Sequence, residues 1–162
     1  MIRIKRLNHA VLFVRDLDRS AAFYRDVLGF EEISRMGESM AFMRAAGSEN
    51  HHDLGLARVG MQAPNPPQGS VGLYHLAWQT ENIEDLAAVQ SALRERAALT
   101  GASDHGATKS IYGTDPDGNE FEVMWAVPRE QWGQWERSAT TRPLDLPREI
   151  AKFGRERASS EG

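Results

Sequence analysis

Residues 8–14 have the sequence NHAVLFV, and residues 74–80 have the sequence YHLAWQT. The two stretches align at an offset of 66 positions, which places His75 on His9. Both have the apolar composition of a strand, and both lead into a segment with helical periodicity. A repeat of this kind indicates a fold built from two similar modules.

Each half of the repeat continues with an expected helix. The first helix is predicted at about 18–28, where Asp16 or Asp18 can cap its start and Gly29 suits the left-handed position after its last turn. The second helix is predicted at about 83–97. Both helices begin with acidic residues, which the helix dipole favours.

Short strand-like stretches, separated by turns rich in Gly, Asn and Asp, follow each helix. They are expected at about 31–35, 40–44, 52–58, 99–102, 109–114 and 121–125. The order of elements predicts an α+β fold of two βαβββ modules, at about 5–59 and 72–126. A proline-containing linker at 60–71 joins the modules, and together they form a domain over residues 1–126.

The pattern stops after this domain, and residues 127–162 are expected to form a C-terminal arm, in which 127–146 is either irregular or a short helix. Trp132 and Trp135 lie three positions apart and would share one face of a helical turn. Two tryptophans in so polar a stretch predict that the arm docks on its own domain or on a twin subunit. The polar stretch 154–162 is expected to be frayed.

Composition limits the class of protein. The chain has 162 residues, 41% hydrophobic and 26% charged, with a net charge of −4, which is the balance of one globular domain. Neither the charge nor the hydropathy favours a nucleic-acid or membrane partner. The absence of cysteine excludes disulfides, thiolate nucleophiles and zinc–thiolate sites, and it suits a reducing compartment. We therefore expect a cytoplasmic protein.

Three side chains suggest a metal site. His9 and His75 occupy equivalent positions of the repeat, so the symmetry of the modules would bring them together. Glu122 lies between Phe121 and Val123, whose apolar side chains should pack under a helix while the glutamate points to the other face of the strand. A buried carboxylate needs a partner, which is either an arginine or a metal ion.

Two imidazoles and one carboxylate form the ligand set of non-haem Fe(II) oxygen enzymes. Hydrolytic zinc sites also use three protein ligands, so the ligand types alone leave the identity of the metal open.

Longer motifs carry a family resemblance. Residues 7–11 (LNHAV), 21–30 (AAFYRDVLGF) and 115–122 (DPDGNEFE) resemble the vicinal oxygen chelate superfamily, which includes glyoxalases, bleomycin resistance proteins and dioxygenases. The resemblance covers about residues 5–126. It implies that the two modules pair into a curved mixed sheet around a metal ion. The ligands it implies are His9, His75 and Glu122.

Residues 50–56 (NHHDLGL) resemble the double-histidine strand of the type I extradiol ring-cleaving dioxygenases within that superfamily. This resemblance implies that His52 is an active-site acid/base and that Tyr112 and His105 are further active-site residues. The spacing between His105 and Tyr112 is shorter than in those enzymes. His51 carries no implied role.

The repeat also contains a difference between its halves. Leu56 aligns with Glu122, so the first module lacks the carboxylate that a glyoxalase-type site with four ligands would use. The resemblance therefore implies an Fe(II) enzyme that cleaves a catechol-like aromatic diol with O2, in aromatic compound catabolism and as a homodimer. Mn(II), Zn(II) and Ni(II) are compatible metals. A metal-dependent lyase or isomerase of the glyoxalase type and a metal-free drug-binding resistance protein are the alternatives.

Overall fold

The structure is a computed structural model that describes residues 2–67 and 69–154. The chain divides into two compact units, with the boundary after Gly72 and with the turn at Asp115–Asn119 grouped with the first unit. The expected fraying of 154–162 falls almost wholly outside the described residues.

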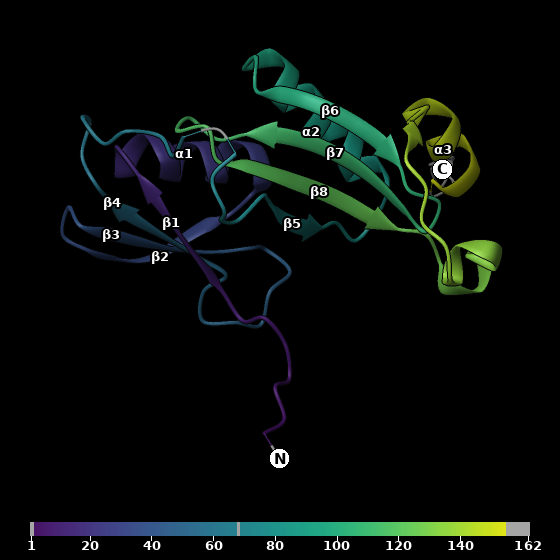
Figure 1. The fold of residues 1–162 in the computed structure, drawn as a ribbon, viewed down its shortest axis with the longest axis horizontal. Helices are drawn as coiled ribbons and strands as arrows, with labels where there is room; N and C mark the ends of the chain where they lie inside the picture. The colour runs from purple at the N-terminus through teal and green to yellow at the C-terminus, as the bar shows by residue number, and fades with distance from the viewer. Residues whose placement is uncertain (1, 68, 155–162) are drawn as a thin grey trace, which may run out of the picture. The chain divides into compact units, whose positions relative to one another are not determined.

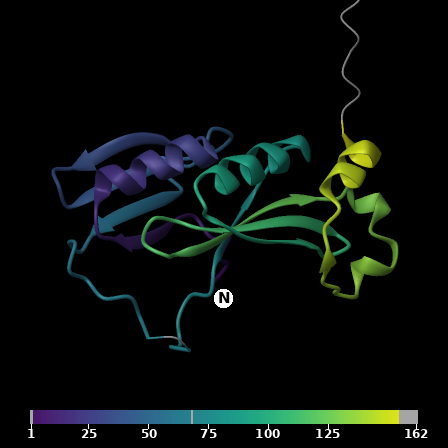
Figure 2. The same cartoon turned by 90° about the horizontal axis from the view of Figure 1, so that it is seen from above.

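The first unit contains one βαβββ module, drawn in purple and blue in Figure 1. Its elements are β1 (Ala10–Val14), α1 (Leu17–Leu28), β2 (Glu31–Met36), β3 (Met40–Arg44) and β4 (Leu54–Arg58). The strands form a mixed sheet in the order β1-β4-β3-β2, in which β1 and β4 are parallel and the other neighbours are antiparallel. Helix α1 packs against β3 and β4, as Figure 2 shows.

The second unit repeats this order. Its elements are β5 (Leu76–Gln79), α2 (Glu84–Glu95), β6 (Leu99–Asp104), β7 (Thr108–Thr114) and β8 (Glu120–Ala126). The sheet order is β5-β8-β7-β6-β9, with β5 and β8 parallel. The arm adds two 3₁₀ turns, η1 (Arg129–Gln131) and η2 (Gly133–Glu136), then β9 (Arg142–Pro143) and α3 (Leu146–Phe153). The predicted α+β fold of two βαβββ modules is confirmed.

The ends of the helices follow from local sequence. Of the two predicted capping residues, Asp16 caps α1, because its side chain accepts a hydrogen bond from the backbone N–H of Arg19 at 2.9 Å. Gly29 ends α1 in the left-handed conformation, with φ of 69°, as predicted. Helix α2 ends differently, because Ala97 has a positive φ of 52° two residues after its last turn.

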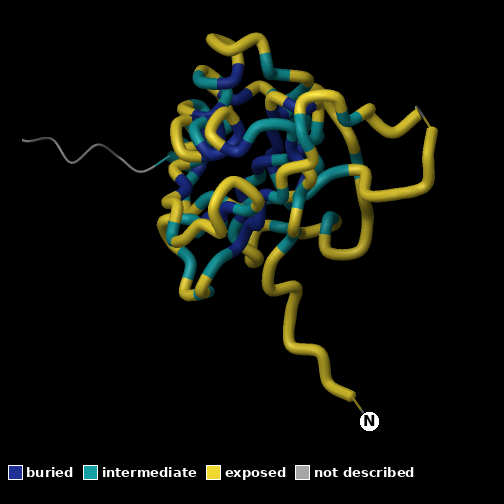
Figure 3. The backbone as a smooth tube through the Cα atoms, turned by 90° about the vertical axis from the view of Figure 1, so that its left-hand side faces the viewer, coloured by how far each residue is buried: buried dark blue, intermediate teal, exposed yellow. Residues whose placement is uncertain are grey.

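Each unit has its own core between helix and sheet. The buried positions of α1 and α2 recur every three or four residues, for example Leu17, Tyr24, Leu86 and Leu93. Phe121, Val123 and Trp125 are buried on β8 while the residues between them are partly exposed, as the alternation in the sequence predicts. The dark blue segments of Figure 3 show these cores, whereas the N-terminal stretch before β1 is exposed.

The turn at Asp115–Asn119 is held by α1 and the residues before it. Asp117 is buried, and its carboxylate accepts hydrogen bonds from the guanidinium groups of Arg15 and Arg19 at 3.1 Å and 2.7 Å. The Tyr24 hydroxyl donates to Asp115 at 3.2 Å. These contacts explain why the turn is grouped with the first unit.

The C-terminal arm docks on its own unit. Strand β9 pairs with β6, and the Phe153 ring lies 5.2 Å from the Trp125 ring between centroids. Trp132 donates its indole N–H to the carbonyl of Val127 at 2.6 Å. Among the described residues, no helix is long and apolar enough to cross a membrane.

Candidate active site

The first unit brings two of the candidate histidines together. His9 directly precedes β1, and His52 lies two residues before β4. Because β1 and β4 are parallel, with Ala10 opposite Leu54, both histidines lie at the same end of the sheet. Their ring centroids are 4.5 Å apart, and the Phe42 ring lies 5.1 Å from that of His52.

The loop that carries His52 is anchored by the next residue. The buried carboxylate of Asp53 accepts hydrogen bonds from the Ser48 hydroxyl, the backbone N–H of Ala45 and the amide of Asn50, at 2.7 Å, 2.9 Å and 2.7 Å. Burial alone would raise the pKa of Asp53, but these hydrogen bonds outweigh it and the pKa is lowered. Asn50 also donates to the backbone carbonyl of Asn8 at 2.9 Å, which ties the loop to the residue beside His9.

The surroundings of His52 favour the neutral form of its imidazole. Burial lowers its pKa, and the nearby imidazoles of His9 and His51 lower it further. A neutral imidazole can accept a proton, so His52 has the chemical character of a base near neutral pH. His51 is exposed, and its Nδ1 lies 3.1 Å from Nδ1 of His52.

The second unit brings His75 and Glu122 into contact. His75 directly precedes β5, which runs parallel to β8, and Ala77 is opposite Glu122. His75 Nε2 lies 3.1 Å from Glu122 Oε2, and His75 Nδ1 lies 3.9 Å from Glu120 Oε1. The imidazole thus lies between two carboxylates.

Tyr112 and His105 lie beside this pair. Tyr112 on β7 is opposite Glu122 on β8, and its ring centroid is 5.9 Å from that of His75. Its hydroxyl is 2.8 Å from His105 Nε2, while His105 Nδ1 is 2.8 Å from the backbone carbonyl of Thr140 in the arm.

These two hydrogen bonds define the direction of the Tyr112 hydroxyl. The Thr140 carbonyl can only accept, so His105 Nδ1 carries a hydrogen. With Nδ1 as the protonated nitrogen of this tautomer, Nε2 accepts the hydrogen of the Tyr112 hydroxyl, which leaves the lone pairs of that oxygen available to a ligand. Burial raises the pKa of Tyr112, as does the negative charge of Glu122, so the phenol stays protonated at neutral pH.

His75 and Glu122 fit a divalent metal ion. The two types of donor suit such ions, and Nδ1 of His75 is buried without a hydrogen-bond partner, with the Glu120 carboxylate nearby. Histidines that bind a metal through one nitrogen are usually oriented by a carboxylate at the other. Among residues 2–67 and 69–154, no group of three His, Cys, Asp or Glu side chains is close enough to hold an ion. His9 belongs to the first unit, and its part in a metal site stays a prediction.

Residues 6–123 match the profile of the Glyoxalase/Bleomycin resistance protein/Dioxygenase superfamily. The match covers most of the chain, and the chain therefore belongs to this superfamily. A structure of a glyoxalase/bleomycin resistance protein/dioxygenase domain from Frankia sp. EAN1pec superposes with a TM-score of 0.65 at 22% identity, over 82% of this chain and 99% of that one. The α+β fold of two βαβββ modules is thus the one that the family resemblance implied, with the described strands in two mixed sheets, while the pairing of the modules around a metal ion stays a prediction.

Curated relatives of this chain include ring-cleaving enzymes. Catechol-2,3-dioxygenase of Bacillus subtilis is 31% identical over 159 residues, which is 95% of this chain and 54% of that protein. Manganese-dependent 2,3-dihydroxybiphenyl 1,2-dioxygenase of Geobacillus genomosp. 3 is 28% identical over 130 residues, 78% of this chain and 38% of that protein. The chain thus spans about two fifths to a little over half of these relatives' length.

The sequence did not reveal two groups that position the candidate residues. Asp53 follows the double histidine, and only this position could have indicated an anchoring role. The Thr140 carbonyl is a backbone atom, so no residue type marks it. The predicted places of His9, His52, His75, His105, Tyr112 and Glu122 in the chemistry remain predictions.

Proposed function

We propose that this chain is a metal-dependent extradiol-type dioxygenase that cleaves a catechol-like aromatic diol with O2. The contact between His75 and Glu122, with Tyr112 and His105 beside it, carries the proposal. The relatives named as dioxygenases favour this reaction over the glyoxalase and drug-binding alternatives, since the superfamily as a whole includes all three.

His9, His75 and Glu122 would hold the metal, which is Fe(II) or, as the name of the Geobacillus relative suggests, Mn(II). When bound, such an ion supplies a common site for both diol oxygens and O2 and lowers the pKa of the diol hydroxyls. Leu56, the counterpart of Glu122 in the first module, is completely buried and offers no fourth ligand.

The remaining candidate residues handle protons. His52 takes a proton from the diol and returns it to the ring-opened product, and its lowered pKa keeps the imidazole ready to accept. Tyr112 accepts a hydrogen bond from the substrate, because its own hydrogen is donated to His105. His105 is a positioning residue, held in turn by the arm. We place this activity in aromatic compound catabolism in the cytoplasm and assign it to a homodimer.

Metal analysis of protein purified without chelators, followed by an oxygen-electrode assay with a panel of catechols, tests the proposal. The expected result is about one metal ion per chain and O2 uptake that parallels the appearance of a yellow ring-opened acid. Turnover under anaerobic conditions would instead support a lyase or isomerase. Protein that binds drugs tightly without metal would support the resistance-type alternative.

A further inference from the structure

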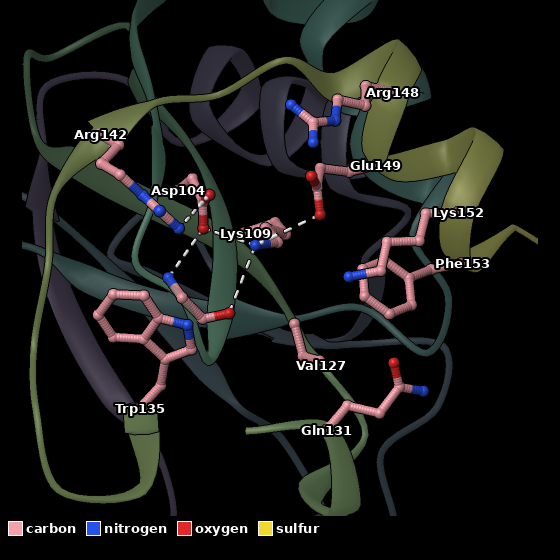
Figure 4. A pocket seen from close by; sticks show the side chains of 11 residues that line it. Asp104, Lys109, Val127, Gln131, Trp135, Arg142, Arg148, Glu149, Lys152 and Phe153 are labelled. Carbon is pink, nitrogen blue, oxygen red and sulfur yellow. Dashed lines mark hydrogen bonds and ion pairs between the residues drawn. The ribbon is translucent and has the colours of Figure 1, made fainter. Parts of the chain in front are cut away.

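A cavity of about 230 Å³ lies in the second unit, where the arm meets the end of the β6–β7 hairpin. None of the candidate metal or acid/base residues lines it. Figure 4 shows side chains from β6, β7 and α3 converging on it, together with Gln131 and Trp135 of the arm. The cavity is thus separate from the candidate active site, although Asp104 and Gly106 in its wall flank His105.

The inner wall of this cavity holds balanced charges. Lys109 is buried, and its ammonium group lies 2.5 Å from Asp104 and 3.4 Å from Glu149. Arg142 donates to the second oxygen of Asp104 at 2.9 Å. Burial works to raise the pKa of Asp104, but the hydrogen bond from Lys109 leads the effects that lower it. Two cations therefore face two carboxylates, and the inner wall has no net charge.

Helix α3 adds two positive charges that this wall does not balance. Arg148 and Lys152 are four positions apart and so lie one turn apart on the same side of the helix. Neither forms an ion pair with a carboxylate of the described residues, and Lys152 lies over the Phe153 ring at 4.4 Å. Like charges at this spacing destabilise a helix slightly, and an anion bound between them would relieve this repulsion. In Figure 4 the Lys152 side chain reaches toward the open centre of the cavity, and the Arg148 side chain lies at its upper edge, above Glu149.

Part of the lining is apolar. Val127 and the rings of Trp135 and Phe153 line the cavity beside the charged groups. Trp135 lies so close to Gly106 that a Cβ there would come within 2.4 Å of the indole. Glycine at this position, where φ is +80°, therefore leaves room for the indole in the cavity wall.

We propose that this cavity is a binding site for a small organic dianion, either a dicarboxylate or a phosphate ester. Two negative charges match the surplus of Arg148 and Lys152, and the guanidinium of Arg148 can bind a carboxylate or phosphate through two parallel hydrogen bonds. The volume is below the 300–1,000 Å³ that is typical for drug-sized ligands, so the ligand is small. Val127, Trp135 and Phe153 supply the smaller, apolar part of a mostly polar lining, and this part can contact the organic body of such a ligand.

Thermal unfolding of the full-length protein with phthalate, inorganic phosphate or chloride at equal ionic strength tests this site. Phthalate at about 100 times its Kd should raise Tm by about 5–10 °C, and phosphate should raise it less. Arg148→Gln and Lys152→Gln should each weaken phthalate binding about tenfold, as measured by calorimetric titration. Arg137→Gln removes an exposed arginine of the same arm that does not line the cavity, and it should leave the affinity unchanged.

Three outcomes would overturn the proposal. Phthalate could raise Tm no more than chloride does, or it could bind equally well to the parent and to the Arg148→Gln, Lys152→Gln double variant. The Arg137→Gln variant could also lose as much affinity as the cavity variants, which would indicate a general effect of charge. The double variant retains all candidate metal-binding residues, so phthalate that binds at a metal would still bind to it. Both replaced residues are exposed, and circular dichroism checks that the variants are folded.

Discussion

The two modules carry a histidine at the same place and differ in the residue that accompanies it. In the first module His9 contacts the ring of His52, and in the second His75 contacts the carboxylate of Glu122. The counterpart of Glu122 in the first module is Leu56, which is completely buried. The two modules therefore have similar backbones. They differ in the residue at one equivalent position, Leu56 on β4 and Glu122 on β8, and we propose that they have different chemical roles.

The largest effect is expected when the second module receives the residue that the first module has at the equivalent position. Glu122→Leu gives β8 the residue that β4 has at the equivalent position, and we expect it to abolish metal binding and O2 uptake. The side chain that is lost is one of three proposed ligands, while leucine keeps the volume of this partly buried position. Metal analysis of the purified variant provides the measurement.

Glu120→Gln is the matched control, because Glu120 lies near the other nitrogen of His75. We expect it to lower metal affinity by about 10–100-fold without abolishing binding, as is typical of groups that orient a ligand. Full metal content in Glu122→Leu would remove this residue from the ligand set.

The first module should supply proton transfer, and His52→Ala tests this. We expect the variant to retain metal and to lose turnover by about 10²–10⁴-fold, the usual contribution of a positioned acid/base. His51→Ala removes the exposed neighbour and should leave turnover close to that of the parent. If His52→Ala loses metal instead, the residue is a ligand, and the two modules contribute differently from what we propose.

The repeat made most of the fold predictable. Helical periodicity and strand alternation identified both helices and the strands of both modules, because these patterns are local and each is supported by its counterpart in the other half. The arm was harder to predict. Strand β9 has only two residues and exists because it pairs with β6, and α3 was not predicted although Asp145 caps it and Pro147 lies in its first turn.

Only part of the geometry of the candidate site followed from the sequence. The alternation around Glu122 indicated that its side chain points away from the helix, and the structure places it beside His75. The hydrogen bond of His105 to the Thr140 carbonyl depends on how the arm docks, which no local pattern in the sequence encodes.

Buried aspartates also differ between the two turns that precede β4 and β8. Asp53 is held by neutral donors, whereas Asp117 is held by two arginines. We expect Asp117→Asn to lower the free energy of unfolding by about 2–3 kcal/mol. That is less than the 3–5 kcal/mol of a fully buried pair, because Arg19 stays partly solvated. Asp53→Asn should cost about 1–2 kcal/mol, since its partners carry no charge.

The pH dependence of the free energy of unfolding tests the contribution of Asp117. Hydrogen bonds from Arg15 and Arg19 outweigh the effect of burial and lower the pKa of Asp117 below the ordinary value of 3.8. Its contribution is therefore complete above that value and is lost as the pH falls through the lower pKa of the folded state. Urea unfolding at several pH values should show a shallower loss of stability in acid for Asp117→Asn than for the parent. An unchanged slope would mean that the arginines stabilise the turn in some other way.

The smallest expected difference concerns the ends of the two helices. Helix α1 ends at Gly29, with φ of 69°, whereas the chain after α2 turns at Ala97, with φ of 52°. A left-handed conformation costs residues with a Cβ about 1–2 kcal/mol, but glycine adopts it freely. Gly29→Ala should therefore lower the free energy of unfolding by about 1 kcal/mol. Ala97→Gly should raise it by about 0.5 kcal/mol, because relief of strain is partly offset by the greater freedom of glycine in the unfolded chain.

Urea unfolding at neutral pH measures both changes, and no side-chain contact complicates the first one, since nothing lies within 4 Å of a Cβ built on Gly29. The double variant exchanges the two residues between the modules. Because the positions belong to different units, the two effects should add, giving a net loss of about 0.5 kcal/mol. If Ala97→Gly destabilises the protein instead, the strain energy at Ala97 is smaller than the free-energy cost of the greater freedom that glycine has in the unfolded chain. The left-handed conformation would then be no more costly at Ala97 than at Gly29.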